Sequence, residues 1–142
     1  MSCKVGFLFF VFFLLNIITA PISAQDQQKV DSLTAIINQN RQDTTVAAAY
    51  MRLADLYVRS NTDTLIPLSK KALEIAEAAN PDDPVLDSAY NNIKANAYNL
   101  IGYSLYYNDS IDACFVYFEK NIEINLILNN KKGLGTSYNN LA

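Results

Sequence analysis

Residues 95–128, ANAYNLIGYSLYYNDSIDACFVYFEKNIEINLIL, contain the pattern that decides the fold. In the first half of this stretch, Tyr98, Ile101 and Leu105 recur at steps of three and four residues, the spacing of one face of an α-helix. Apolar residues in the second half repeat that spacing. Between the halves lies Asn-Asp-Ser at 108–110, and these residue types favour turns. The stretch therefore predicts a pair of helices joined by a tight turn.

The same helical spacing covers the rest of the chain from about residue 26. Asp43 or Thr44 can cap the second helix, and the prolines at 81 and 84 must end the third. No stretch alternates in the manner of a β-strand, so the sequence predicts an all-α fold. The expected helices cover about 26–40, 44–58, 64–79, 85–107, 111–129 and 134 onward.

Three segments resemble one another, which indicates an internal repeat. They contain Tyr50, Tyr98 and Tyr138, and in each a long or branched apolar residue follows three positions later, then Gly or Ala. The helices that follow the first two segments also align, at 69–75 and 118–124. The repeated unit is therefore a helical hairpin.

With these residues the chain resembles the tetratricopeptide repeat family, most clearly over 95–128. The resemblance implies hairpins that stack into a right-handed superhelical solenoid. It also implies that small residues lie where helices cross closely and that large aromatic residues lie beside them. The repeat-packing residues implied in this way are Tyr50, Leu53, Ala54, Tyr57, Ala72, Tyr98, Ile101, Gly102, Cys114 and Phe118.

The resemblance also divides the chain into parts. Residues 25–43 would form an N-terminal capping helix, and residues 44–142 the repeats. The units would cover about 44–80, 85–129 and an incomplete 134–142. Because the third unit lacks its second helix, we expect this sequence to be the N-terminal part of a longer protein.

In this family the concave surface, formed by the first helix of each hairpin, binds peptides. Amide side chains can bond an extended peptide backbone, and tyrosine joins a large apolar area to a polar tip. The family's carboxylate clamp is not matched, because Met51 and Asp55 stand at its first positions. For Tyr106 and Tyr107, packing against a neighbouring unit is an open alternative. The groove residues implied are Met51, Asp55, Arg59, Asn96, Asn99, Tyr103, Tyr106 and Asn139, with Ala48, Tyr107 and Thr136 at related positions.

Residues 1–24 differ from the rest of the chain and contain five of its seven Phe. Lys4 precedes an apolar run over 5–15, and small residues lead up to Ala24. This pattern is typical of a secretory signal peptide that is cleaved after Ala24. A retained membrane anchor over about 5–24 is the alternative.

The composition argues against several kinds of chemistry. The chain has no His, which removes imidazole bases and histidine metal ligands. Cys114 would be the one Cys left after cleavage, with neither a disulfide partner nor a His base. Acidic pairs such as Asp82-Asp83 are interpreted as helix caps, and a net charge of −3 without a basic cluster disfavours nucleic acid. We therefore expect no catalytic residue, cofactor or metal site in this chain.

These expectations combine into a non-catalytic module that binds a protein or peptide, with self-association left open. The signal peptide, the lead helix and the repeats together resemble the exported region of bacterial repeat-containing sensor histidine kinases and regulators. That resemblance implies a periplasmic or extracytoplasmic location at the inner membrane of a Gram-negative bacterium. It also implies a membrane helix and an output domain further along the chain. A free-standing periplasmic scaffold without an output domain is the alternative.

Overall fold

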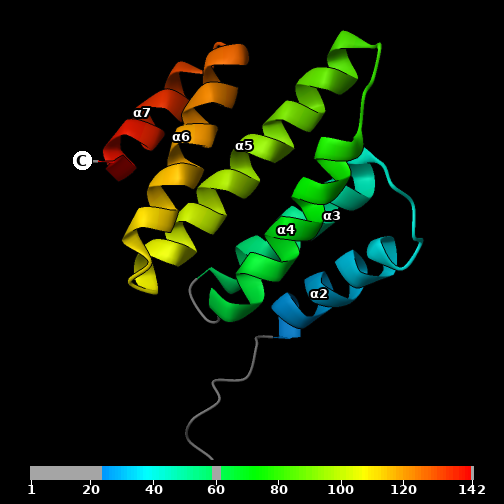
Figure 1. The fold of residues 1–142 in the computed structure, drawn as a ribbon. Coiled ribbons are helices and arrows are strands. Elements are labelled where there is room, and N and C mark those ends of the chain that lie inside the picture. The colour runs from blue at the N-terminus through cyan, green and yellow to red at the C-terminus, as the bar shows by residue number, and fades with distance from the viewer. Residues whose placement is uncertain (1–23, 59–61, 142) are drawn as a thin grey trace, which may run out of the picture.

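The described part of the protein is helical throughout. The structure is a computed structural model that describes residues 24–58 and 62–141. Of these residues, 84% lie in six helices and none lies in a strand (Figure 1). The all-α prediction is thereby confirmed. The predicted signal peptide lies outside the described residues except for Ala24, where the first described helix begins.

The helix bounds agree with the expected ranges to within a few residues. The largest differences are at the end of α2, which ends at Ile37 instead of at 40, and at the start of α7, which begins at Lys131 instead of at 134. The earlier start of α7 has a local cause, since Asn130 Oδ1 accepts a hydrogen bond from the Gly133 N–H at 3.0 Å. An asparagine that accepts in this way begins a helix, so Gly133 lies inside α7. The helices are α2 (Ala24–Ile37), α3 (Thr44–Tyr57), α4 (Thr62–Ala78), α5 (Pro84–Tyr107), α6 (Ile111–Ile127) and α7 (Lys131–Leu141).

Short polar residues begin and end several of these helices. Asp43 caps α3 by accepting from the Val46 N–H at 3.0 Å. Asp83 caps α5 in the same way, and Pro84 occupies the first position of that helix, where a missing N–H costs least. Asn40, Asp109 and Asn129 follow the ends of α2, α5 and α6 with positive φ. Asn and Asp tolerate this left-handed conformation better than other non-glycine residues, which explains their place at the turns.

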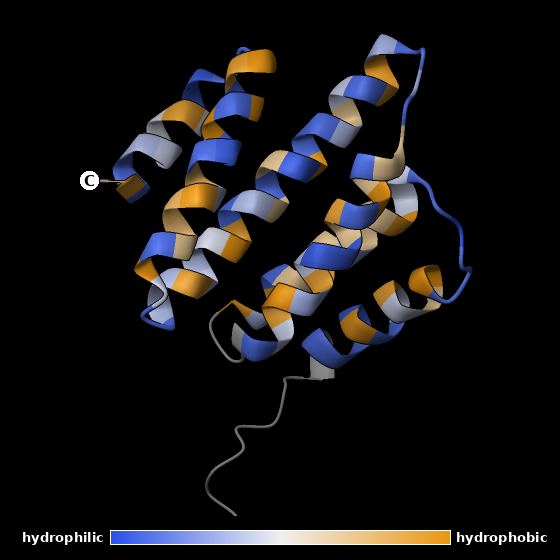
Figure 2. Ribbon diagram, in the orientation of Figure 1, coloured by the Kyte–Doolittle hydropathy of each residue, from blue (hydrophilic) through white to orange (hydrophobic). Residues whose placement is uncertain are grey.

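The helices pack in the order in which they occur in the chain. Each helix contacts the next one, and α3 also contacts α5 (Figure 1). Hydrophobic and hydrophilic residues are interspersed along the helices (Figure 2). At helical spacing such a mixture gives each helix an apolar face for these contacts. The buried apolar core joins α3, α4 and α5 and is formed by Val46, Ala47, Met51, Ala72, Leu73, Ile75, Ala76, Tyr90, Ile93, Ala97, Tyr98 and Ile101.

Most residues expected to pack between repeats are buried. Tyr50 and Tyr57 are half-buried, and Tyr50 packs against the apolar core. Met51 is also in this core with 6% of its surface exposed, although it was predicted to face the groove. The physical reason is tertiary packing, because Met51 belongs to one apolar cluster with buried residues of α4 and α5. That part of the groove prediction is corrected. The buried packing residues are Leu53, Ala54, Ala72, Tyr98, Ile101, Gly102, Cys114 and Phe118.

The crossing of α5 and α6 depends on the absence of a side chain at Gly102. A Cβ atom built there would lie 2.7 Å from the ring of Phe118, which is itself buried. Contacts that short do not occur between real side chains, so only glycine permits this approach. The small residue and the large aromatic residue therefore meet as the sequence predicted.

We expect Gly102→Ala to reduce the free energy of unfolding by about 1–3 kcal/mol, because the Phe118 ring has little room to shift. Urea denaturation followed by circular dichroism measures this loss. Gly135→Ala is the matched control, since no atom lies within 4 Å of a Cβ built there. A helical Gly→Ala change of that kind leaves stability unchanged or raises it by up to about 1 kcal/mol. Equal effects of the two changes would contradict the close crossing.

Tyr98 connects three helices. Its hydroxyl donates to Glu77 Oε1 of α4 at 2.6 Å. Its ring lies 6.2 Å from the ring of Tyr117, and Lys120 Nζ is 5.4 Å from its centre, both on α6. Burial, followed by the hydrogen bond and charge of Glu77, raises the pKa of the Tyr98 hydroxyl well above its ordinary value.

A raised pKa in the folded protein makes stability depend on pH. The contribution of Tyr98 to the free energy of unfolding is complete below about pH 10, the ordinary pKa of a tyrosine hydroxyl in the unfolded chain. It is lost as the pH rises above that value. Tyr98→Phe removes one hydrogen bond, which lowers stability by about 1 kcal/mol at neutral pH. Denaturation series from neutral to alkaline pH should show a smaller alkaline loss for the variant than for the wild type. If the stabilities of the variant and the wild type fall in parallel as the pH rises, Tyr98 is not the group that makes stability depend on pH.

Candidate functional site

Two adjoining cavities lie along the line where α5, α6 and α7 meet. The smaller one, here called the amide cavity, has a volume of about 110 Å³. Asparagine is the commonest residue in its wall, which therefore presents many donors and acceptors. The residues that line it are Ala95, Asn96, Asn99, Asn121, Asn125, Asn130, Gly133 and Thr136.

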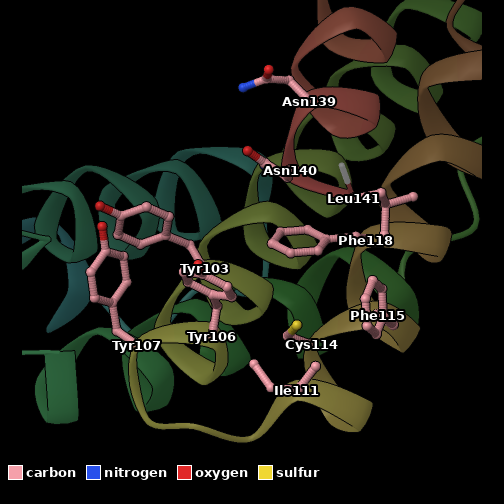
Figure 3. Close-up of a pocket in the computed structure, with 10 residues that line it drawn as sticks. All are labelled: Tyr103, Tyr106, Tyr107, Ile111, Cys114, Phe115, Phe118, Asn139, Asn140 and Leu141. Carbon is pink, nitrogen blue, oxygen red and sulfur yellow. The ribbon is translucent and has the colours of Figure 1, made fainter.

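The larger one, here called the aromatic cavity, has a volume of about 360 Å³. Figure 3 shows three tyrosines of α5 on one side and the phenylalanines of α6 on the other. The end of α7 supplies two asparagines at its upper rim. The residues that line it are Tyr103, Tyr106, Tyr107, Ile111, Cys114, Phe115, Phe118, Asn139, Asn140 and Leu141.

A hydrogen bond between α5 and α7 joins a residue that lines one cavity to a residue that lines the other. Asn140 Nδ2 of α7 donates to Asn99 Oδ1 of α5 at 2.9 Å. Asn140 lines the aromatic cavity and Asn99 lines the amide cavity, so the bond lies at their common boundary. The cavities therefore form one groove with a polar part and an aromatic part.

Buried amides hold the polar part in place. Asn121 is 4% exposed, and its Nδ2 donates to the Ala95 carbonyl of α5 at 2.6 Å. Its Oδ1 accepts from the Ser137 hydroxyl of α7 and from Asn125 Nδ2. Asn125 Oδ1 in turn accepts from Asn130 Nδ2 at 2.8 Å. This amide network connects α5, α6 and α7. None of the residues of the apolar core described above belongs to α7.

Tyrosines form the outer wall of the aromatic part. The ring of Tyr107 lies 4.6 Å from that of Tyr103 and 5.6 Å from that of Tyr106, within the range of favourable aromatic pairs. Tyr106 and Tyr107 are 54% and 60% exposed. Within the described residues, no neighbouring unit covers these two rings. Their exposed rings are available for contact with a ligand.

Cys114 lies at the inner wall of the aromatic cavity, opposite the tyrosines (Figure 3). Its side chain is buried and free of any disulfide. Burial, and to a smaller extent the charge of Asp112, raises the pKa of the thiol. A thiol that resists ionisation is a poor nucleophile, so the arrangement favours packing over covalent chemistry at Cys114.

The structure brings most of the predicted groove residues together. Asn96 and Asn99 line the amide cavity, and Tyr103, Tyr106 and Asn139 line the aromatic cavity. Asp55 is exposed on α3 and lines neither, although partial burial of its carboxyl raises its pKa. Met51 is in the core, as described above, and Arg59 lies outside the described residues.

Sequence reasoning did not identify the buried part of the groove. None of Asn121, Asn125 and Asn130 was among the predicted groove or packing residues. The available signal was the run of asparagines at steps of four and five along 121–130, on the side of α6 that faces α5. An amide repeated on an otherwise apolar helix face indicates a buried network.

A further cavity of about 500 Å³ lies between α2 and α3 and is lined by residues that include Lys29, Leu33 and Arg52. Lys29 already pairs with Asp26 at 3.0 Å, and Arg52 is exposed. None of the predicted groove residues lines this cavity, which is formed largely by the outer surface of α2. The groove between α5 and α7 is therefore the candidate site.

Over residues 24–58 and 62–141, no group of three or more Cys, Asp or Glu side chains is arranged to hold a metal ion. Within the same ranges, no helix has both the length and the apolar composition needed to cross a membrane. No family model, curated protein or solved structure matches the chain. The functional assignment therefore depends on the groove and on the sequence patterns.

Gly133→Ala tests the amide network, because a Cβ at this position would overlap the side chains of Asn125 and Asn130. We expect the start of α7 to move away from α6, and amide hydrogen exchange in α7 to accelerate at least about tenfold. Exchange in α3, α4 and α5 should stay unchanged, since none of their core contacts involves α7. Gly135→Ala, which meets no neighbouring atom, serves as the control. Unchanged protection of α7 in Gly133→Ala would show that the network does not hold this helix.

Proposed function

We propose that this chain is a non-catalytic module that binds an extended segment of another protein in the groove between α5 and α7. The observation that carries the proposal is the groove itself, which combines an amide cavity with an aromatic cavity of about 360 Å³. Cavities of a few hundred Å³ with a few converging polar groups are typical of binding sites. Amides satisfy a peptide backbone, and tyrosine rings cover apolar side chains.

Two side chains of the groove are available for new hydrogen bonds. Asn96 and Asn139 are exposed, and neither amide has a hydrogen-bond partner in the part of the chain that the structure describes. An extended peptide has N–H and C=O groups that lose water on binding and must find partners. The free amides of Asn96 and Asn139 can supply those partners.

The proposed architecture is a tetratricopeptide-like stack of hairpins. Three features support it: the contact of each helix with the next, the additional contact between α3 and α5, and the crossing at Gly102 and Phe118. In such a stack α3, α5 and α7 are the first helices of successive units. Residues on α5 and α7 would then share one concave surface.

The proposed location is outside the cytoplasm, and the support for it is the apolar stretch with Lys4 before it and Ala24 at its end. An exported binding module of this kind fits the sensory or scaffold part of a bacterial signal-transduction protein. No acid–base role is proposed for the acidic residues, because several of them cap helices or form exposed ion pairs, as Asp83 and Glu74 do.

Replacement of both free amides tests the binding role. Peptides of about twelve residues selected from a random library on the full chain should bind Asn96→Ala/Asn139→Ala at least about tenfold more weakly, which corresponds to the loss of two net hydrogen bonds. Helicity should not fall, since both residues are exposed on helices and alanine favours helix. Fluorescence anisotropy gives the affinities, and circular dichroism gives the helicity.

Asn80→Ala is the matched control, because Asn80 is an exposed asparagine in the connection between α4 and α5 and lines neither cavity. Its affinity for the selected peptides should equal that of the wild type. Equal binding by the double variant would place the peptide site elsewhere on the chain.

A further inference from the structure

We infer that the groove selects an uncharged segment, with one aromatic or large aliphatic side chain in the aromatic cavity and its backbone along the amide cavity. This inference rests on the proposed function and adds the chemical character of the partner. It follows from the charge, the size and the wall chemistry of the two cavities.

The first observation is the absence of charge in the lining. Over residues 24–58 and 62–141, none of the acidic or basic side chains lines either cavity. On α5 and its C-terminal turn, no charged residue occurs over 95–108, and on α7 none follows Lys132. The charged residues of α6 are exposed and lie outside both linings.

A lining without charge discriminates against charged ligands. A carboxylate or ammonium group that enters the groove loses its water and finds no ion of opposite sign in the lining. Uncharged amide and phenol groups compensate this loss only in part. A neutral segment meets no such penalty, because its backbone groups find amide partners and its apolar side chain finds aromatic walls.

The second observation is the difference in size. About 360 Å³ accommodates a large side chain together with part of the adjoining backbone. About 110 Å³ is the space of only a few water molecules, so the amide cavity suits backbone groups or small polar groups. The anchoring side chain of the partner therefore fits in the aromatic cavity, which is the larger of the two.

The third observation distinguishes a peptide from a neutral oligosaccharide, which also suits asparagine and tyrosine. On the side of the aromatic cavity opposite the tyrosines, most of the lining consists of apolar side chains of α6 and α7, among them Ile111, Phe115 and Leu141 (Figure 3). Sugar hydroxyls buried against that wall would lack hydrogen-bond partners. An aromatic or aliphatic side chain buries apolar surface there at no such cost.

Selection from a random library of peptides of about twelve residues on the full chain tests this inference. Enriched peptides should contain fewer Asp, Glu, Lys and Arg than the unselected library and should share one aromatic or large aliphatic position. The affinity of one such peptide, acetylated and amidated, should change less than about twofold between about 0.05 and 0.5 M salt. Replacement of its shared residue by Asp or Lys should weaken binding more than about tenfold.

Asn139→Lys supplies a matched test on the protein, because Asn139 is exposed at the rim of the aromatic cavity. The variant should lose affinity for the neutral peptide and gain affinity for its Asp-containing form, with strong salt dependence. Asn80→Lys adds the same charge outside the groove and should change neither affinity.

The possible failures are distinguishable. Enriched peptides with a shared charge, or binding that weakens steeply with salt, would overturn the inference and leave the proposed function intact. A library that yields no peptide sensitive to Asn96→Ala/Asn139→Ala would overturn both. Binding of maltohexaose in place of peptides, or self-association of the chain that Asn139→Lys abolishes, would identify another occupant and also overturn both.

Discussion

The groove depends on one buried side chain, the amide of Asn121. This side chain donates to a carbonyl of α5 and accepts from Asn125 of its own helix and from Ser137 of α7. A buried amide that loses its partners leaves polar groups without water, at a cost of about 1–3 kcal/mol each. The position of α7 is therefore fixed by the need to satisfy Asn121. Because Asn99, Asn139 and Asn140 take their relative places from that position, the two cavities follow from it.

The molecule uses two kinds of joint between helices. From α3 to α5 the joint is an apolar core in which Met51, Tyr90 and Ile93 pack together. From α5 to α7 it combines buried amides with apolar contacts between α5 and α6, such as Tyr98 with Tyr117 and Gly102 with Phe118. Apolar burial is stronger in total but fixes direction weakly, whereas hydrogen bonds require defined positions. The polar joint lies where the proposed ligand binds, so the asparagines that fix the helices are neighbours of those available to a partner.

Local features of the chain were predictable because their causes are local. Asp43 and Asp83 cap helices through N–H groups two or three residues away, and Pro84 starts α5 for the same local reason. The resemblance to the repeat family implied that Ile101, Cys114 and Phe118 pack between helices, and all three are buried. It also implied that Asn96 and Tyr103 face the groove, and they line its two cavities. Met51 does not face the groove, because it is buried in a cluster with residues of α4 and α5, which follow α3 in the chain.

The sequence by itself therefore determined the helices and most of their ends. Its resemblance to the repeat family pointed to the small and large residues that meet at the α5–α6 crossing and to the candidate groove residues. Tertiary structure decided that Asn121, Asn125 and Asn130 form one network and that the groove is divided into an amide part and an aromatic part. It also decided that no charged residue of the described part of the chain lines either cavity. The physical reason is range: helix periodicity and capping act over one or two turns, whereas a cavity is the space left between side chains of three helices.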